Sequence, residues 1–179
     1  MIIKASIALL ITLAVVGTTS QILRPPTPRL LYNPSESAPV GWYRVQSNFP
    51  IKRGAQVAAY GPEWARRLAD ERGYLPYNYP LIKTVWAVEG EEVCYNDQSV
   101  SVPKRPDIPV LGQDVLGRDM PQKSGCLVLE SGEYLLMSPD VQTGFDSRYF
   151  GPVRKENLIG VVHYIGGDRS LKRPKNSGF

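Results

Sequence analysis

Short apolar runs alternate with turn-forming residues along most of the 179-residue chain. Clusters containing Gly, Pro, Asn or Asp separate these runs, a pattern that is typical of β-strands joined by turns. The pattern predicts strands within residues 40–46, 49–60, 79–95, 99–103 and 156–167. It also predicts a hairpin over residues 126–138, with its turn at Ser131 and Gly132.

One segment has the end signals of a helix. Residues 62–73 start with Pro62, carry Glu63 in the first turn and stop at Gly73. This helix either covers the edge of a sheet, which we prefer, or acts as a lid over a groove. With the strands above, it gives a mainly β fold with one or two small helices.

The N-terminus carries one long uncharged run, residues 5–23, directly after Lys4. A helix of that length would be about 28 Å long, close to the thickness of a bilayer core. The run is either an uncleaved signal anchor or a cleaved secretory signal, and the lack of an Ala-x-Ala site favours the anchor. We expect residues 1–24 to be this segment, 25–32 a linker, 33–167 an exported domain and 168–179 a flexible basic tail.

Cysteine content agrees with export. In an oxidising compartment Cys94 and Cys126 can form a disulfide that is worth roughly 3–4 kcal/mol, and we favour this over two buried thiols. Two cysteines and the single histidine, His163, do not make a convincing zinc site, so we expect no metal.

Charge excludes one class of partner. The 21 Lys and Arg residues exceed the 17 Asp and Glu residues by only four, and they are scattered rather than arranged in a stripe. We therefore expect no nucleic-acid partner.

The stretch "NPSESAPVGWYRV", residues 33–45, holds Ser35 and Ser37 among residues that break both helix and strand. It is either a plain loop or a rigid turn that presents a hydroxyl group. A rigid turn lowers the cost of aligning that hydroxyl with a substrate carbonyl, and Asn33 can tie such a turn to its own backbone.

A nucleophilic serine needs a base. His163 lies in an apolar strand and is best explained as an ordinary strand residue, but a lysine can replace histidine if burial lowers its pKa by about 3 units. Lys83, within "PLIKTVWAV", has apolar neighbours on both faces of a predicted strand. It is either an edge lysine whose amine reaches water or a general base.

These segments resemble the serine–lysine signal peptidases, and most closely the TraF-type peptidases of conjugation. Their nucleophile motif resembles Asn-x-Ser/Thr-x-Ser-x-Pro-x-Gly-x-Tyr, which is matched by Asn33, Ser35, Ser37, Pro39, Gly41 and Tyr43. The resemblance implies that Ser37 is the nucleophile and that the Ser35 hydroxyl and the Ser37 N–H form the oxyanion hole. It assigns Asn33 to support of the turn, and Pro39 and Tyr43 to substrate binding.

Two further motifs carry the resemblance. Lys83 falls on the position of the family's general base, within "LIKTVWAVEGEEV". The family's Asp-Ser-Arg-x-x-Gly-x-Val…Ile-x-Gly motif is matched by Asp146, Ser147, Arg148, Gly151, Val153 and Gly160. The resemblance makes Asp146 a third catalytic candidate, whereas its alternative role is a structural ion pair with Arg148.

The chain departs from the family pattern just before that motif. Ser138-Pro139-Asp140 replaces the usual Gly-Asp-Asn, and Gly144 stands where a serine that contacts the lysine is often found. We therefore expect Thr143 or Asp146 to be the hydrogen-bond partner of the lysine.

The resemblance implies a signal-peptidase-like antiparallel β domain in the periplasm, attached to the cytoplasmic membrane. It also implies a cofactor-free serine endopeptidase that processes a pilin precursor or another exported polypeptide after small residues, with conjugation machinery as a partner. The product would be a cleaved chain or a head-to-tail cyclic one. The alternatives are a non-enzymatic assembly factor that holds pilin, and a general signal peptidase, although those enzymes usually have Met at the position of Ala38.

Overall fold

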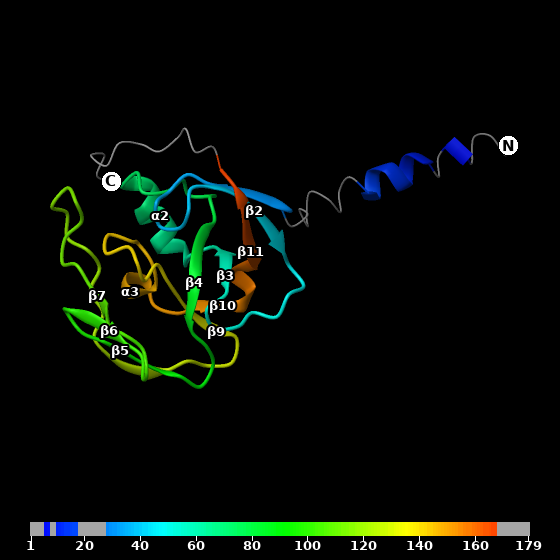
Figure 1. Cartoon of the computed structure of the whole chain (residues 1–179). Coiled ribbons are helices and arrows are strands. Elements are labelled where there is room, and N and C mark those ends of the chain that lie inside the picture. Colours follow the sequence, from blue (N-terminus) through cyan, green and yellow to red (C-terminus); the bar gives the residue numbers. More distant parts are fainter. Residues whose placement is uncertain (1–5, 8–9, 18–27, 168–179) are drawn as a thin grey trace.

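The computed structural model describes residues 6–7, 10–17 and 28–167. Within this part of the chain, most strands belong to one large antiparallel sheet with the order β1-β2-β11-β3-β4-β9-β10 (Figure 1). Its strands are β1 (Leu30–Asn33), β2 (Gly41–Gln46), β3 (Gln56–Ala59), β4 (Leu81–Ala87), β9 (Glu133–Met137), β10 (Val153–Arg154) and β11 (Leu158–Gly166). The mainly β prediction is confirmed, and β1 begins inside the range predicted as a linker.

A smaller sheet has the order β7-β6-β5-β8. It contains β5 (Glu92–Tyr95), β6 (Ser99–Ser101), β7 (Ile108–Pro109) and β8 (Gly125–Val128). β4 leads directly into β5 through a turn at Glu89 and Gly90, so the chain passes from the large sheet to the small one at this point.

The predicted hairpin over residues 126–138 is wrong. Its two strands exist, but β8 pairs with β5 whereas β9 pairs with β4 and β10. Leu129 explains the separation, because its backbone exchanges hydrogen bonds with the β4–β5 turn through Glu91 O and Gly90 N–H. β8 therefore runs along β5 in the small sheet as far as that turn, and the chain then enters the large sheet as β9.

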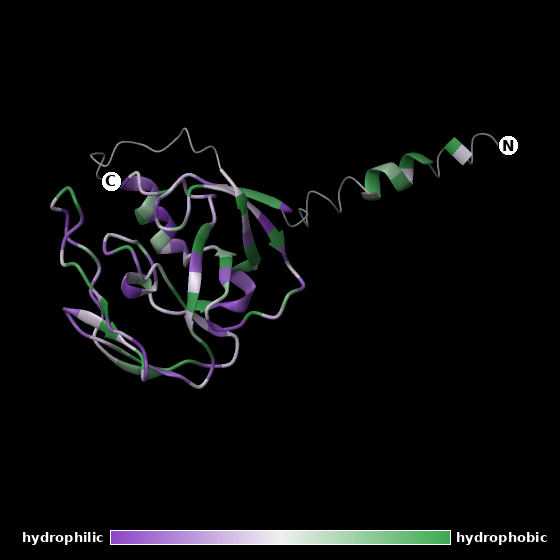
Figure 2. Cartoon of the chain, viewed as in Figure 1, coloured by the Kyte–Doolittle hydropathy of each residue, from purple (hydrophilic) through white to green (hydrophobic). Residues whose placement is uncertain are grey.

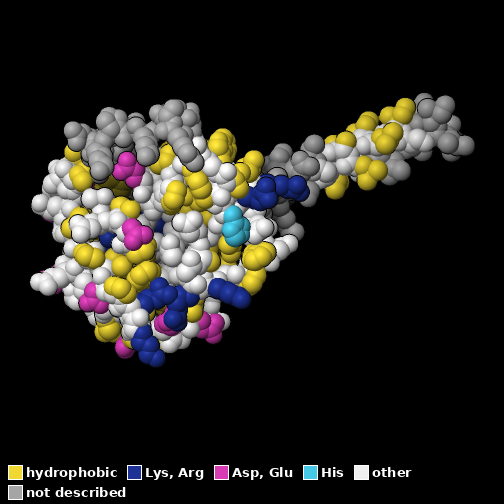
Figure 3. Space-filling view, viewed as in Figure 1, with side chains coloured by type: hydrophobic (Ala, Val, Ile, Leu, Met, Phe, Trp, Pro, Cys, Tyr) yellow, Lys and Arg dark blue, Asp and Glu magenta, His cyan; other side chains and the backbone are white. Residues whose placement is uncertain are grey.

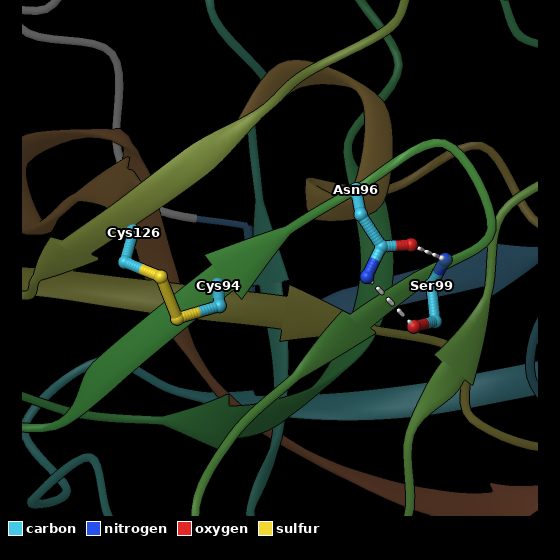
Figure 4. The surroundings of a disulfide bond; sticks show 4 residues. All are labelled: Cys94, Asn96, Ser99 and Cys126. Atoms are coloured by element: carbon cyan, nitrogen blue, oxygen red, sulfur yellow. Dashed lines mark hydrogen bonds between the residues drawn. A yellow bond between two sulfur atoms is a disulfide. The ribbon is translucent and has the colours of Figure 1, made fainter.

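The disulfide prediction is confirmed. Cys94 and Cys126 stand directly opposite each other in β5 and β8, and their Cα atoms are 4.0 Å apart. Figure 4 shows the bond across the two strands, beside the turn that Asn96 forms with Ser99. The bond ties the exposed edge strand β8 to the centre of the small sheet.

Helix α2 (Glu63–Glu71) confirms the predicted helix, and the short helix α3 (Ser147–Phe150) follows the loop after β9. Ala65 of α2 and Phe150 of α3 are buried in the same apolar cluster as Val57, Val85 and other sheet residues. Both helices thus pack on the face of the large sheet, over central strands, so α2 covers the sheet but not its edge as predicted. A single 3₁₀ turn, η1 (Lys155–Asn157), precedes β11.

A second apolar cluster lies where the two sheets meet, and it joins Leu135 and Met137 of β9 to Val93 and Val100 of the small sheet. The third cluster, built from Tyr43, Val45, Ala58, Ile82 and Val162, lies under the loop between β1 and β2. Ala38 of that loop packs against it, so the serine loop is seated on the large sheet.

Residues 10–17 are helical and exposed, and Figure 2 colours most of this segment as hydrophobic. Among the residues described, no helix combines the length and the apolar character needed to cross a membrane. The predicted segment over residues 5–23 extends outside the described residues, and the predicted tail over residues 168–179 lies entirely outside them.

The surface has mixed character. On the face seen in Figure 3, Lys and Arg side chains lie close to Asp and Glu side chains rather than in one continuous stripe. Several large apolar side chains near the β1–β2–β11 end of the sheet are about half exposed, namely Leu30, Trp42, Phe49, Tyr164 and Ile165.

Candidate active site

The loop between β1 and β2 is built around one buried amide. Asn33, at the end of β1, donates through Nδ2 to the carbonyl oxygens of Ser35 (2.8 Å), Ala38 (2.9 Å) and Pro39 (3.2 Å). Its Oδ1 accepts from the N–H of Ser35 at 3.2 Å and from Ser35 Oγ at 3.1 Å. A single side chain thus satisfies backbone groups that prolines and a tight turn leave without ladder partners.

The two serine hydroxyls are in direct contact, with 2.8 Å between Ser35 Oγ and Ser37 Oγ. Both residues are partly exposed, whereas Asn33 below them is only 5% exposed. The loop therefore presents two adjacent hydroxyl groups at the surface on a buried support.

Tyr43 has a different role from the predicted one. Its side chain is fully buried, its hydroxyl donates to Pro39 O at 2.7 Å, and burial raises its pKa to about 12. Because a substrate does not reach a fully buried ring, Tyr43 supports the serine loop and does not bind substrate. Pro39 is exposed at the surface, so only Pro39 of this predicted pair is accessible.

Lys83 lies in the middle of β4, opposite Val57 of β3. It is 3% exposed, and its Nζ donates to Ser138 Oγ at 2.8 Å. Burial lowers its pKa to about 8, an effect that the carboxylate of Asp146 opposes and the guanidinium of Arg148 reinforces. The amine is buried and does not extend to water, which excludes the edge-lysine interpretation.

Ser138 is the residue that the sequence analysis missed. The sequence predicts Thr143 or Asp146 as the partner of the lysine, but in the described part of the chain its hydrogen-bond partner is Ser138. Register gives the reason, since Thr84 pairs with Met137 and the next position on each strand, Lys83 and Ser138, then lies face to face. Predicting this contact from the sequence would have required the β4–β9 pairing.

Gly144 lies against Ser138 and Arg148. A Cβ atom built on Gly144 would lie 3.1 Å from Arg148 Nη2, 3.2 Å from Ser138 Cβ and 3.2 Å from Val141 O, all tighter than ordinary contacts. A side chain at position 144, such as the serine often found there in the family, would therefore be crowded.

Asp146 and Arg148 form a fully buried ion pair at 2.7 Å. Asp146 also accepts from the N–H of Ser138 at 2.8 Å, and it caps α3 by accepting from the N–H of Arg148 at 3.1 Å. Arg148 donates further to the carbonyl oxygens of Pro109, Ser138, Val141 and Gln142. These contacts match the ion-pair interpretation of Asp146, which holds Ser138 in place.

The structure brings the two halves of the predicted site onto one sheet without a direct bond between them. No hydrogen bond joins Ser37 to Lys83 among those of the described residues, because Ser37 is paired with Ser35 and Lys83 with Ser138. On the serine side, Ala38 packs against the apolar cluster that contains Ile82, the residue before Lys83 in β4. Catalytic hydrogen bonds are often long or poorly aligned when no substrate is bound.

No three His, Cys, Asp or Glu residues within the described part of the chain are grouped as a metal site would need. His163 is exposed and lies 2.9 Å from Gln46 Oε1, with Phe49 against its ring.

Comparisons with known proteins identify the family of the chain. The family model described as "Signal peptidase, peptidase S26" matches residues 2–166. The chain is 37% identical over 144 residues to a plasmid transfer protein TraF of Escherichia coli, covering 74% of this chain and 80% of that protein. It is also 34% identical over 147 residues to the conjugal transfer protein TraF of Agrobacterium tumefaciens (strain 15955), covering 76% and 81%.

A solved structure matches as well. The crystal structure of a signal peptidase I from Enterococcus faecalis V583 has a TM-score of 0.37 and 17% identity, covering 65% of this chain and 98% of that one. Since the family model spans nearly the whole chain and the TraF relatives match most of it, the chain belongs to the peptidase S26 family of signal peptidases and is of the TraF type.

Proposed function

We propose that the protein is a serine endopeptidase with Ser37 as nucleophile and Lys83 as general base, acting on an exported polypeptide in conjugation. Family membership supports peptidase activity, and the relatives named for plasmid and conjugal transfer support the setting. One observation carries the assignment of these residues. The buried amine of Lys83, with its lowered pKa, lies on the same sheet as the loop in which the hydroxyls of Ser35 and Ser37 are in contact.

Acylation follows from these groups. With its pKa lowered to about 8, Lys83 is neutral in a useful fraction of molecules near neutral pH. Lys83 Nζ takes the proton of Ser37 as Ser37 Oγ bonds to the scissile carbonyl carbon, and the carbonyl π electrons move onto oxygen. The Ser35 hydroxyl and the Ser37 N–H stabilise that oxyanion, and one such donor is worth roughly 3–4 kcal/mol in serine proteases.

The intermediate then releases the first product. The C–N bond breaks, Lys83 returns its proton to the leaving amine, and the substrate acyl group stays on Ser37 as an ester. Attack by water gives a free carboxylate, whereas attack by the amino terminus of the same substrate gives a cyclic chain. The lysine base deprotonates either attacking group, and Ser37 recovers the proton when the ester breaks.

The substrate would bind as an added strand. β1 is an edge strand of the seven-stranded sheet, and the serine loop follows it directly. An extended peptide that pairs with a sheet edge gains backbone hydrogen bonds and passes the loop in an extended form. The half-exposed apolar side chains at this end of the sheet suit a periplasmic domain that works beside the cytoplasmic membrane.

Mass spectrometry of a co-expressed pilin precursor tests the proposal. The wild-type protein should shorten the precursor, whereas the Ser37→Ala and Lys83→Ala variants should leave its mass unchanged. A product that is lighter than the linear fragment by one water identifies cyclisation.

Thermal unfolding shows whether the inactive variants are folded. Normal processing by either folded variant would exclude the corresponding residue assignment. Stable binding of an unaltered pilin by the wild-type protein would instead support the assembly-factor alternative.

A further inference from the structure

The hydrogen bonds of the serine loop have a defined direction. The Asn33 amide cannot be turned over, because its Nδ2 already donates to three carbonyl oxygens, those of Ser35, Ala38 and Pro39. Asn33 Oδ1 is therefore an acceptor, and the Ser35 hydroxyl must donate its single proton to it.

This direction settles the contact between the two serines. Once the Ser35 proton is committed to Asn33, Ser35 Oγ can only accept in its 2.8 Å contact with Ser37. The proton of Ser37 then points toward Ser35 and is not available to Lys83. Lys83 in turn donates to Ser138, which agrees with the lack of a hydrogen bond between Ser37 and Lys83 in this part of the chain.

We propose that Asn33 is a positioning residue that holds the empty site in this resting direction until a substrate carbonyl competes for the Ser35 hydroxyl. The inference rests on the proposed function of Ser37 and Lys83. Asn33 is 5% exposed and lies beneath the loop, so it acts through Ser35 and does not touch the substrate.

Substrate binding exchanges two hydrogen bonds and breaks no covalent bond. The Ser35 hydroxyl turns from Asn33 Oδ1 to the substrate oxygen, and Ser37 Oγ moves toward the substrate carbonyl carbon and leaves its contact with Ser35 Oγ. Ser37 is then free to donate to the lone pair of neutral Lys83. Formation of the oxyanion hole and activation of the nucleophile thus become one event, which protects the empty site from reacting with other carbonyl groups.

The direction of the Ser37 hydrogen bond affects the pKa of Lys83 even when no substrate is bound. If Ser35 or Asn33 is truncated, the Ser37 hydroxyl no longer has a Ser35 oxygen that is fixed as its acceptor. Its proton then turns to the neutral amine of Lys83. That new hydrogen bond favours the neutral amine and lowers the pKa of Lys83. A net hydrogen bond is worth enough to move a pKa by roughly 0.5–1 unit.

The experiment is an NMR titration of the full-length chain labelled with ¹³C-lysine, in which the Cε signal of Lys83 is identified by its loss in the Lys83→Met variant. The pKa of Lys83 should fall in both Ser35→Ala and Asn33→Ala. The same two changes made in a Ser37→Ala background should leave it unchanged. Asp146 and Arg148, the charged groups that act on Lys83, are untouched by all of these variants.

An unchanged or raised pKa of Lys83 in Ser35→Ala would overturn the proposal. So would a fall in that pKa that is equally large when Ser35→Ala is made in the Ser37→Ala background. Ser35→Ala removes one partly exposed hydroxyl and keeps all three bonds from Asn33 Nδ2, so it carries the test even if Asn33→Ala does not fold. Because the titration uses no substrate, its outcome is separate from the processing assay for the proposed function.

Discussion

The two halves of the site are held by different kinds of interaction. A neutral amide organises the serine loop, and all of its partners lie within six residues of it in the chain. A buried ion pair organises the lysine side, where Lys83 lies 55 residues before its partner Ser138, which Arg148 holds from ten residues further on. The comparison shows that the nucleophile is placed by local structure and the base by tertiary structure.

The difference has a chemical use. A nucleophile that must meet many carbonyl groups is kept near the surface, and neutral hydrogen bonds position it without changing the local charge. A base that must be neutral near pH 7 needs burial, and the Asp146–Arg148 pair positions its partner Ser138 while adding little net charge.

The largest expected effect is on the cleavage rate when Lys83, the proposed base, is replaced. Lys83→Met should lower the single-turnover cleavage rate by about 10³-fold or more, because the apolar chain fills the site and cannot accept a proton. Cleavage of a pilin-derived peptide measures the rate. Lys52, which is exposed on the surface, gives a matched control, and Lys52→Met should cleave at the wild-type rate.

Arg148→Met tests the lysine side as a structural unit. It leaves the carboxylate of Asp146 buried without its partner, which should lower the free energy of unfolding by about 3–5 kcal/mol. Urea denaturation measures this loss. Arg67→Met is the matched control, since its pair with Glu63 is well exposed and should contribute little to stability. Equal effects of the two changes would show that the buried pair is not the support described here.

Ser138→Ala should reduce the cleavage rate by roughly 10–100-fold, since Lys83 loses the acceptor that orients it. It should also lower the free energy of unfolding, because the buried amine of Lys83 is left without this acceptor. An equal cleavage rate in Ser138→Ala and the wild type would mean that the hydroxyl beside the lysine is not what matters.

The smallest effect concerns stability against pH. Lys83 has a pKa of about 8 in the folded protein and an ordinary value of 10.5, so the cost of burying its charge is fully present below pH 8. Between about pH 8 and 10.5 the unfolded chain binds more protons, and stability rises with pH. Lys83→Met should therefore be more stable than the wild type by about 2 kcal/mol at pH 6, with the difference shrinking above pH 8. Urea denaturation at each pH measures the difference in the free energy of unfolding between the two proteins. A difference that stays constant across this range would argue against a buried amine.

The sequence predicted what local patterns determine. The turn residues and apolar alternation identified most strands, helix α2 and the serine loop, because each signal lies within a dozen residues. The disulfide followed from residue type and export. The crossing from β8 to β9 was missed, since a turn at Ser131 and Gly132 predicts a hairpin whichever sheets its strands join.

The contacts of the lysine side were outside the reach of local patterns. Ser138 contacts Lys83 because β4 pairs with β9, a pairing across more than fifty residues that no spacing reveals. Tyr43 was placed on the substrate side because it belongs to the motif of the serine loop. Its full burial shows that a motif identifies which residues act together without showing which of them are exposed.

The central claim is that Lys83 is the base, and the pH dependence of the single-turnover cleavage rate tests it most directly. From about pH 5 to about pH 8 the rate should rise close to tenfold for each pH unit, and it should level off above about pH 8, where the buried amine has lost its proton. A rate that stays constant across this range would show that no group with the pKa of Lys83 takes the proton of Ser37.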